Sequence, residues 1–139
     1  MSRPTRSFKL RLSEGGMDLL INAHCHHIRS TRRLIAWGTT LHVAVGYLDR
    51  LPLQALAAAM EQTCSAGLVG AEEHHLGAPN DLIGLATGIA ERMGALAPDK
   101  PPPSLGSIYP LALRALLAAD SDAILATYLQ IKHGLEDKV

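Results

Sequence analysis

Cysteine and aromatic residues are both scarce in this chain. Its 139 residues include two cysteines, Cys25 and Cys64, which lie far apart in the sequence and match no disulfide framework. Aromatic residues make up 4% of the chain, whereas alanine and leucine are common, and this mixture favours helices packed against helices. A low cysteine content argues against a small secreted disulfide scaffold and suits a reducing compartment. We therefore expect a mainly α-helical, cytoplasmic protein.

Long apolar runs are also missing. No stretch approaches the roughly 20 apolar residues that a membrane-spanning helix needs. The basic start of the chain leads into an alternating pattern rather than into the apolar region of a signal peptide. The sequence therefore predicts no membrane partner.

Familiar catalytic motifs are absent as well. The chain contains no Walker-type phosphate loop, no dinucleotide-binding GxGxxG and no GxSxG nucleophile elbow. Its most catalytic-looking cluster is Glu72-Glu73-His74-His75, where carboxylates adjoin imidazoles. We interpret this cluster as a solvated loop, and the sequence predicts neither an enzyme nor a cofactor.

A histidine-rich segment raises the question of a metal site. His24, Cys25, His26 and His27 are suitable ligand types, but the chain has no paired CxxC or HExxH spacing, and a structural zinc needs four ligands. His24 lies on an apolar helical stripe, which predicts a hydrogen-bonded core residue, whereas His26 and His27 are expected in a solvated turn. We therefore predict no metal site.

Charge is divided unevenly along the chain although the net charge is zero. Residues 1–50 hold eight lysines and arginines against three acidic residues, a formal charge of +5. Residues 51–139 hold five basic residues against ten acidic ones, a formal charge of −5. This asymmetry suggests that the first part faces a polyanion while the remainder assembles copies or contacts a second protein.

An alternating segment near the start predicts a β-strand. In Arg6-Ser7-Phe8-Lys9-Leu10-Arg11-Leu12, the three apolar side chains are expected to share one face, and Arg6, Lys9 and Arg11 to lie on or near the other. One face is suited to a core and the other to phosphates or base edges. A lone strand needs a partner, and we find no later strand pattern, so the expected partner is the same strand of another copy.

Two helices are expected after this strand. Ser13 is placed to cap a helix that runs to about His27, and Ser30 or Thr31 to cap a second that runs to about Asp49. The pattern after Pro52 predicts helices over about 53–64, 81–96, 111–119 and 121–133, a glycine-containing loop over 67–80, and a proline-rich connector that includes 98–103.

This order of elements resembles a ribbon-helix-helix domain, the fold of the Arc and MetJ repressors, over residues 6 to about 48. The resemblance implies a DNA-binding and dimerisation domain over 1–50, in which two copies pair their strands into an antiparallel ribbon. Residues 51–139 would then form a helical region for assembly or partner binding, with the proline-rich connector at 98–103 inside it.

The resemblance also implies roles for particular residues. In this family the ribbon reads base edges in the major groove, and the start of the second helix grips phosphate. The positions that would contact bases are Ser7, Lys9 and Arg11. The positions that would contact phosphate are Arg29, Ser30, Thr31, Arg32 and Arg33.

The leading functional hypothesis is sequence-specific binding of double-stranded DNA by a homodimer or higher homo-oligomer. Relatives in this family act as transcriptional repressors or as plasmid-transfer accessory proteins of the relaxosome. The competing hypothesis is a helical interaction protein, such as an inhibitor or adaptor from a mobile element, which does not bind DNA. The zero net charge favours this alternative, because dedicated DNA-binding proteins are often basic overall.

Overall fold

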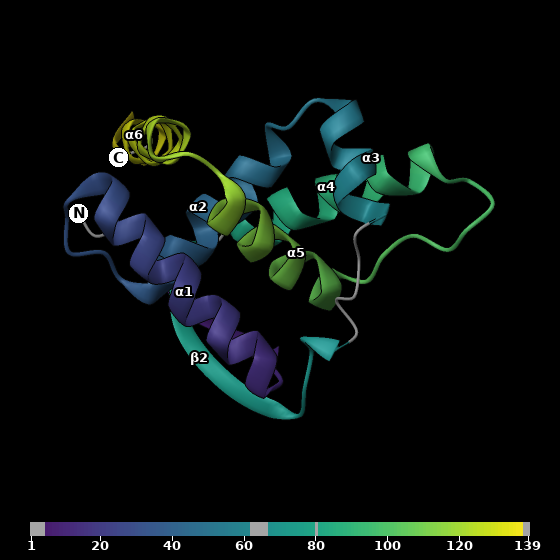
Figure 1. Cartoon of the computed structure of the whole chain (residues 1–139), viewed down its shortest axis with the longest axis horizontal. Helices are drawn as coiled ribbons and strands as arrows, with labels where there is room; N and C mark the ends of the chain where they lie inside the picture. The colour runs from purple at the N-terminus through teal and green to yellow at the C-terminus, as the bar shows by residue number, and fades with distance from the viewer. Residues whose placement is uncertain (1–4, 62–66, 80, 138–139) are drawn as a thin grey trace.

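The computed structural model describes residues 5–61, 67–79 and 81–137. In this part of the chain it contains six helices and two strands, so the expected mainly helical class is confirmed. Figure 1 shows α2 in the interior, with α1 and α5 crossing it, α3 and α4 on one side, and α6 seen end-on at the other. Strand β2 curves along the lower side of the molecule beneath α1 (Figure 1).

The first strand pairs within its own chain. Strand β1 (Thr5–Leu12) runs antiparallel to β2 (Glu72–Pro79), and the register places Lys9 opposite His75 and Arg11 opposite Glu73. The sequence-based expectation of a loop over 67–80 is therefore wrong, as is the inference that β1 lacks a partner strand in the same chain. The sheet requires no second copy to satisfy one edge of β1.

An alternation of side chains accounts for the second strand. His74, Leu76 and Ala78 occupy one row, opposite Leu10, Phe8 and Arg6 of β1, and Glu73, His75 and Gly77 occupy the other. The register therefore places Arg6 in the row of Phe8 and Leu10, and the expectation that it lies with Lys9 and Arg11 is wrong. Ala78 is buried at 1% exposure, whereas the residues of the second row are exposed. The segment contains no β-branched or aromatic residue, so burial and cross-strand pairing, rather than intrinsic propensity, stabilise it as a strand.

Helix α1 (Glu14–Thr31) begins where the sequence predicts and ends later. Ser13 caps it, because the Ser13 hydroxyl accepts a hydrogen bond of 3.1 Å from the Gly16 amide. Ser30 and Thr31 do not cap a second helix, since their hydroxyls donate to carbonyls four residues earlier and they belong to the last turn of α1. Arg32, in the left-handed region at φ 55°, terminates the helix.

Helix α2 (Trp37–Asp49) is the central element. Nine of its thirteen residues are buried, which is typical of a helix covered on most sides. Its start lies against β2, because a Cβ built on Gly38 would be 1.7 Å from the Gly77 carbonyl oxygen. Only glycine permits this approach of a helix backbone to a strand backbone.

Four further helices complete the fold: α3 (Leu53–Glu61), α4 (Asp81–Leu96), α5 (Leu105–Ala118) and α6 (Ser121–Asp137). The bounds of α4 match the sequence-based expectation. Helix α5 begins six residues earlier than expected and contains Pro110 in its second turn. A proline this close to a helix start removes one backbone hydrogen bond, and the buried residues around it offset that loss.

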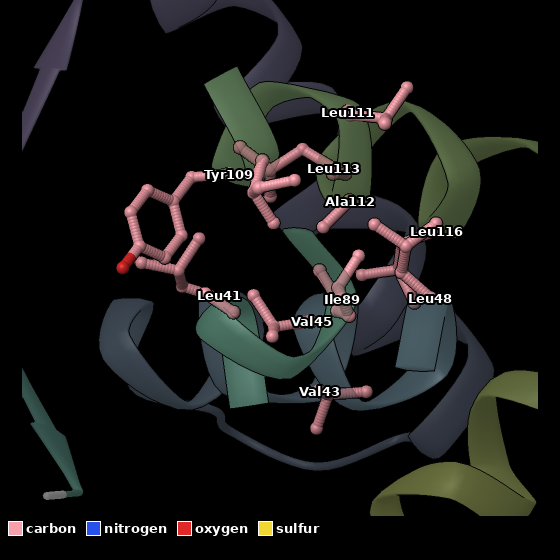
Figure 2. Packing of buried hydrophobic residues seen from close by; sticks show 14 of the residues in the cluster. Leu41, Val43, Val45, Leu48, Ile89, Tyr109, Leu111, Ala112, Leu113 and Leu116 are labelled. Carbon is pink, nitrogen blue, oxygen red and sulfur yellow. The ribbon is translucent and has the colours of Figure 1, made fainter. Parts of the chain in front are cut away.

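One hydrophobic core joins the two parts that the sequence divides at residue 50. Leu41, Val45 and Leu48 of α2 face Ile89 of α4 and the buried row of α5 (Figure 2). Leu10 and Leu12 of β1 belong to the same core. The basic first part and the acidic remainder are therefore packed together rather than arranged as a separate head and tail.

Candidate functional site

The outward face of the β1–β2 sheet carries two of the expected base-contacting residues. Lys9 and Arg11 are exposed, with side-chain exposures of 48% and 59%. Both contact Glu73 on β2, since the Lys9 Nζ lies 3.5 Å from its Oε2 and the Arg11 Nη2 donates to its Oε1 at 3.1 Å. Such exposed ion pairs stabilise a protein by at most about 1 kcal/mol each, so the Lys9 and Arg11 side chains remain available to a polyanion.

Ser7, the third expected base contact, lies in the same strand. The register places it opposite Gly77, at the end of the sheet away from Arg11. Its side chain lies outside the described part of the structure.

Three arginines lie at the end of α1 and just after it. Arg29, Arg32 and Arg33 are exposed, and the segment that holds them leads into the start of α2, which packs against Gly77. The Arg33 guanidinium lies 5.7 Å from the centre of the Tyr128 ring of α6, a cation–π arrangement that directs it towards α6.

Ser30 and Thr31 do not fit the phosphate-binding role in the way that the resemblance implies. They occupy the carboxy-terminal turn of α1, where the helix dipole disfavours an anion. The Thr31 side chain is also buried and donates to the His27 carbonyl. The positive helix end belongs to the start of α2, where Ala36 caps without a side-chain hydrogen bond.

A second polar cluster lies inside the molecule, where α1 meets α2. The Nδ1 atoms of His24 and His27 lie 2.6 Å and 2.9 Å from the Thr40 hydroxyl oxygen. His24 stacks on Trp37 with ring centres 3.9 Å apart, and His27 meets the edge of Tyr128 at 5.6 Å. The prediction that His24 is a hydrogen-bonded core residue is confirmed. The prediction of a solvated turn at His26 and His27 is wrong, because both lie within α1, where His27 is buried and His26 is half-buried.

The hydrogen bonds of this cluster determine which imidazole nitrogens carry protons. The Thr40 hydroxyl has one proton, so it donates to one imidazole and accepts from the other. The Nε2 of His27 is buried without a hydrogen-bond partner among the described residues, and an N–H at this atom would be an unsatisfied donor. The favoured arrangement is therefore that His27 donates from Nδ1 to Thr40, which donates to His24.

Burial keeps both imidazoles neutral. Burial lowers the pKa of His27 to about 4, and repulsion from His24 and His26 adds to the shift. The pKa of His24 is lowered by burial as well. Thr40 is fully buried, and its contacts with His24 and His27 join α2 to α1.

Neither polar region forms a metal centre within the described chain. No group of three or more histidine, cysteine or acidic side chains there is arranged to hold a metal ion. The Nε2 of His26, the third histidine in α1, lies 2.7 Å from the Ala119 carbonyl oxygen. Sequence reasoning missed the β2 contribution to the outward face, although the alternation of His74, Leu76 and Ala78 was a usable signal.

Comparisons with protein-family models, with curated proteins and with solved structures find no match to the chain. Over the described residues, no helix has the length and apolar character needed to cross a membrane.

Proposed function

We propose that this protein binds double-stranded DNA with the outward face of the β1–β2 sheet. The observation that carries the proposal is a two-stranded antiparallel sheet with one face in the core and Lys9 and Arg11 in one row on the other. A two-stranded ribbon has the width that the major groove of DNA admits, and lysine and arginine are the side chains that most often read guanine there.

The basic segment at the end of α1 supplies the phosphate contacts in this proposal. Arg29, Arg32 and Arg33 are exposed, and the start of α2 adds amide groups at the positive end of a helix. Phosphate contacts fix the position of a protein on the duplex, and base contacts provide its sequence preference. Action as a repressor or as a plasmid-transfer accessory protein would rest on this same binding.

The proposal does not require the expected homodimer, because β1 already has a partner strand in its own chain. The homodimer remains a prediction of the resemblance. Sedimentation equilibrium of the protein, alone and with a short duplex, tests it: a dimer in either sample supports it, and a monomer in both rules it out at those concentrations.

The first test is a fluorescence-anisotropy salt titration on a pool of random duplexes. Wild type should bind with an affinity that falls with salt, by about 0.9 log unit per decade for each contacted phosphate. The Lys9→Ala/Arg11→Ala variant should lose its sequence preference in a selection from that pool. The Arg29→Ala/Arg32→Ala/Arg33→Ala variant should instead lose affinity for all sequences and show a shallower salt dependence.

A charge-matched control separates local contacts from the overall charge. The Lys100→Ala/Arg114→Ala variant removes two exposed basic side chains that lie outside both basic regions. It should bind duplex DNA as wild type does. The proposal is overturned if wild type fails to bind duplex DNA at low salt, or if the control loses as much affinity as the Lys9→Ala/Arg11→Ala variant.

A further inference from the structure

A groove follows the strand edge of β1 that faces away from β2. Its walls are residues 8–11 of β1, Val69, Ile83 of α4, and Leu105 and Tyr109 of α5, and its volume is about 270 Å³. Pockets for drug-sized ligands are larger, roughly 300–1,000 Å³. A space of this size and apolar character suits a few side chains of a docked segment rather than a whole small molecule.

The strand edge itself forms one wall of this groove. Phe8 and Leu10 point to the core side of the sheet and Lys9 and Arg11 to the outward side, and a space lined by all four residues fits a position beside the strand edge. No residue of β2 lines it. Within the described residues the sheet has two strands, so this edge of β1 has no strand beside it.

We propose that this edge groove binds an extended, acidic segment of a partner protein, which adds to the sheet as a third strand beside β1. Main-chain hydrogen bonds to an open strand edge supply affinity in such complexes, and pockets for alternate side chains supply specificity. Apolar side chains of the segment enter the groove between β1 and α5, and its acidic side chains lie across from Lys9 and Arg11.

The charge of β1 determines this choice of occupant. On the side where β1 is already paired, its outward row lies across from Glu73, His75 and Gly77, and the Glu73 carboxylate contacts both Lys9 and Arg11. Antiparallel pairing with a second copy of β1 centred on Leu10 would instead place Lys9 across from Arg11, and such like-charge pairs are destabilising. Basic side chains on edge strands also discourage pairing between identical chains.

This inference is independent of DNA binding and adds a consequence to it. The acidic segment would neutralise Lys9 and Arg11, the same two side chains that the proposed DNA contact uses. Segment and duplex are therefore expected to compete, although binding of the segment is measured without DNA.

The test uses a fluorescein-labelled peptide of alternating glutamate and leucine, about seven residues long, which is close to a usual strand length. Anisotropy should show saturable binding to the full chain. Binding should be lost when alternate amides of the peptide are N-methylated, because that blocks strand pairing. A peptide with lysine in place of glutamate should bind about tenfold more weakly to wild type, and the order should reverse for Lys9→Glu/Arg11→Glu.

Two glycine variants locate the site. A Cβ on Gly106, which lines the groove, or on Gly88 of α4, which does not, would meet no atom within 4 Å. Gly106→Phe should therefore fill the groove and abolish binding, whereas Gly88→Phe should bind as wild type does. Thermal unfolding of both variants checks that they remain folded.

Several results would overturn the proposal. They are absence of binding, equal binding of the N-methylated or lysine peptide to wild type, and unchanged binding by a folded Gly106→Phe. A wild-type dimer in light scattering that Gly106→Phe converts to a monomer would make a second copy the occupant instead. None of these results depends on whether the protein binds DNA.

Discussion

The two faces of the β1–β2 sheet have opposite surroundings although their side chains alternate along the same strand. Leu10 and Leu12 are 2% and 1% exposed and belong to the core. Lys9 and Arg11, their sequence neighbours, are about half exposed, and both contact the Glu73 carboxylate. Neighbouring residues of β1 therefore contribute to different properties: the buried row stabilises the fold, and the outward row provides charge for binding.

The largest expected effect is on the core row. Leu10→Ala should reduce the free energy of unfolding by about 3–4 kcal/mol, because it removes buried methyl groups and leaves a cavity. Lys9→Ala, one position away, should change it by less than about 0.5 kcal/mol. Urea denaturation of both variants measures the difference. Equal destabilisation by the two substitutions would contradict the assignment of the two faces.

The contrast between buried and exposed side chains extends to the histidines. The pKa of His27 is about 4 in the folded chain, below the 6.5 of an unperturbed imidazole, so protonation favours unfolding. Its contribution to stability is fully present above pH 6.5 and is lost as the pH falls from 6.5 towards 4. At about 1.4 kcal/mol per pKa unit, the loss is at most about 3–4 kcal/mol.

Urea denaturation across this pH range checks the prediction. His27→Gln should flatten the dependence, because glutamine does not titrate. An unaltered pH dependence in His27→Gln would show that other groups cause the acid instability.

The contact between α2 and the sheet is expected to have the next largest effect. Gly38→Ala places a methyl group against the Gly77 carbonyl oxygen, and overpacking of this kind costs about 1–3 kcal/mol. Gly84→Ala in α4 is the matched control, since its added Cβ would meet no atom within 4 Å and alanine favours a helix. Thermal unfolding should show a lower midpoint for the first variant and an equal or higher one for the second. A wild-type midpoint for Gly38→Ala would exclude the close backbone contact.

The smallest effect is expected on the outward row. Glu73→Gln removes the carboxylate that contacts both Lys9 and Arg11, so duplex DNA should bind a few-fold more tightly, a change of under about 1 kcal/mol. Glu91→Gln, an exposed carboxylate of α4, controls for the change in net charge. Anisotropy at fixed salt measures both. Weaker binding by Glu73→Gln would indicate that the carboxylate positions the Lys9 and Arg11 side chains for DNA rather than competing with DNA for them.

Local patterns were sufficient to predict several features. The alternation in residues 6–12 predicted both β1 and its buried face, because side chains in a strand alternate with period two. Ser13 predicted the start of α1, since a hydroxyl before a helix accepts from its first amides. The apolar stripe after Asp81 predicted α4 in the same way.

Other features depend on neighbours that are distant in the sequence. Residues 72–79 read as a loop because they lack typical strand residues, yet pairing with β1 stabilises them as β2. His27 read as solvated because histidine is polar, yet Thr40 and Tyr128 enclose it. A helix was expected to start at Ser30, but the Ser30 hydroxyl donates to the His26 carbonyl, so this residue belongs to the last turn of α1.

The sequence by itself determined the helical class, the two faces of β1 and the basic character of the first fifty residues, because each follows from the order of neighbouring side chains. Only the tertiary structure decided which strand pairs with β1, where α1 ends and which histidines are buried. These properties depend on contacts between residues far apart in the chain, such as Gly38 with Gly77 and His27 with Tyr128. The free energy of such contacts exceeds local preference wherever a segment is covered by the rest of the fold.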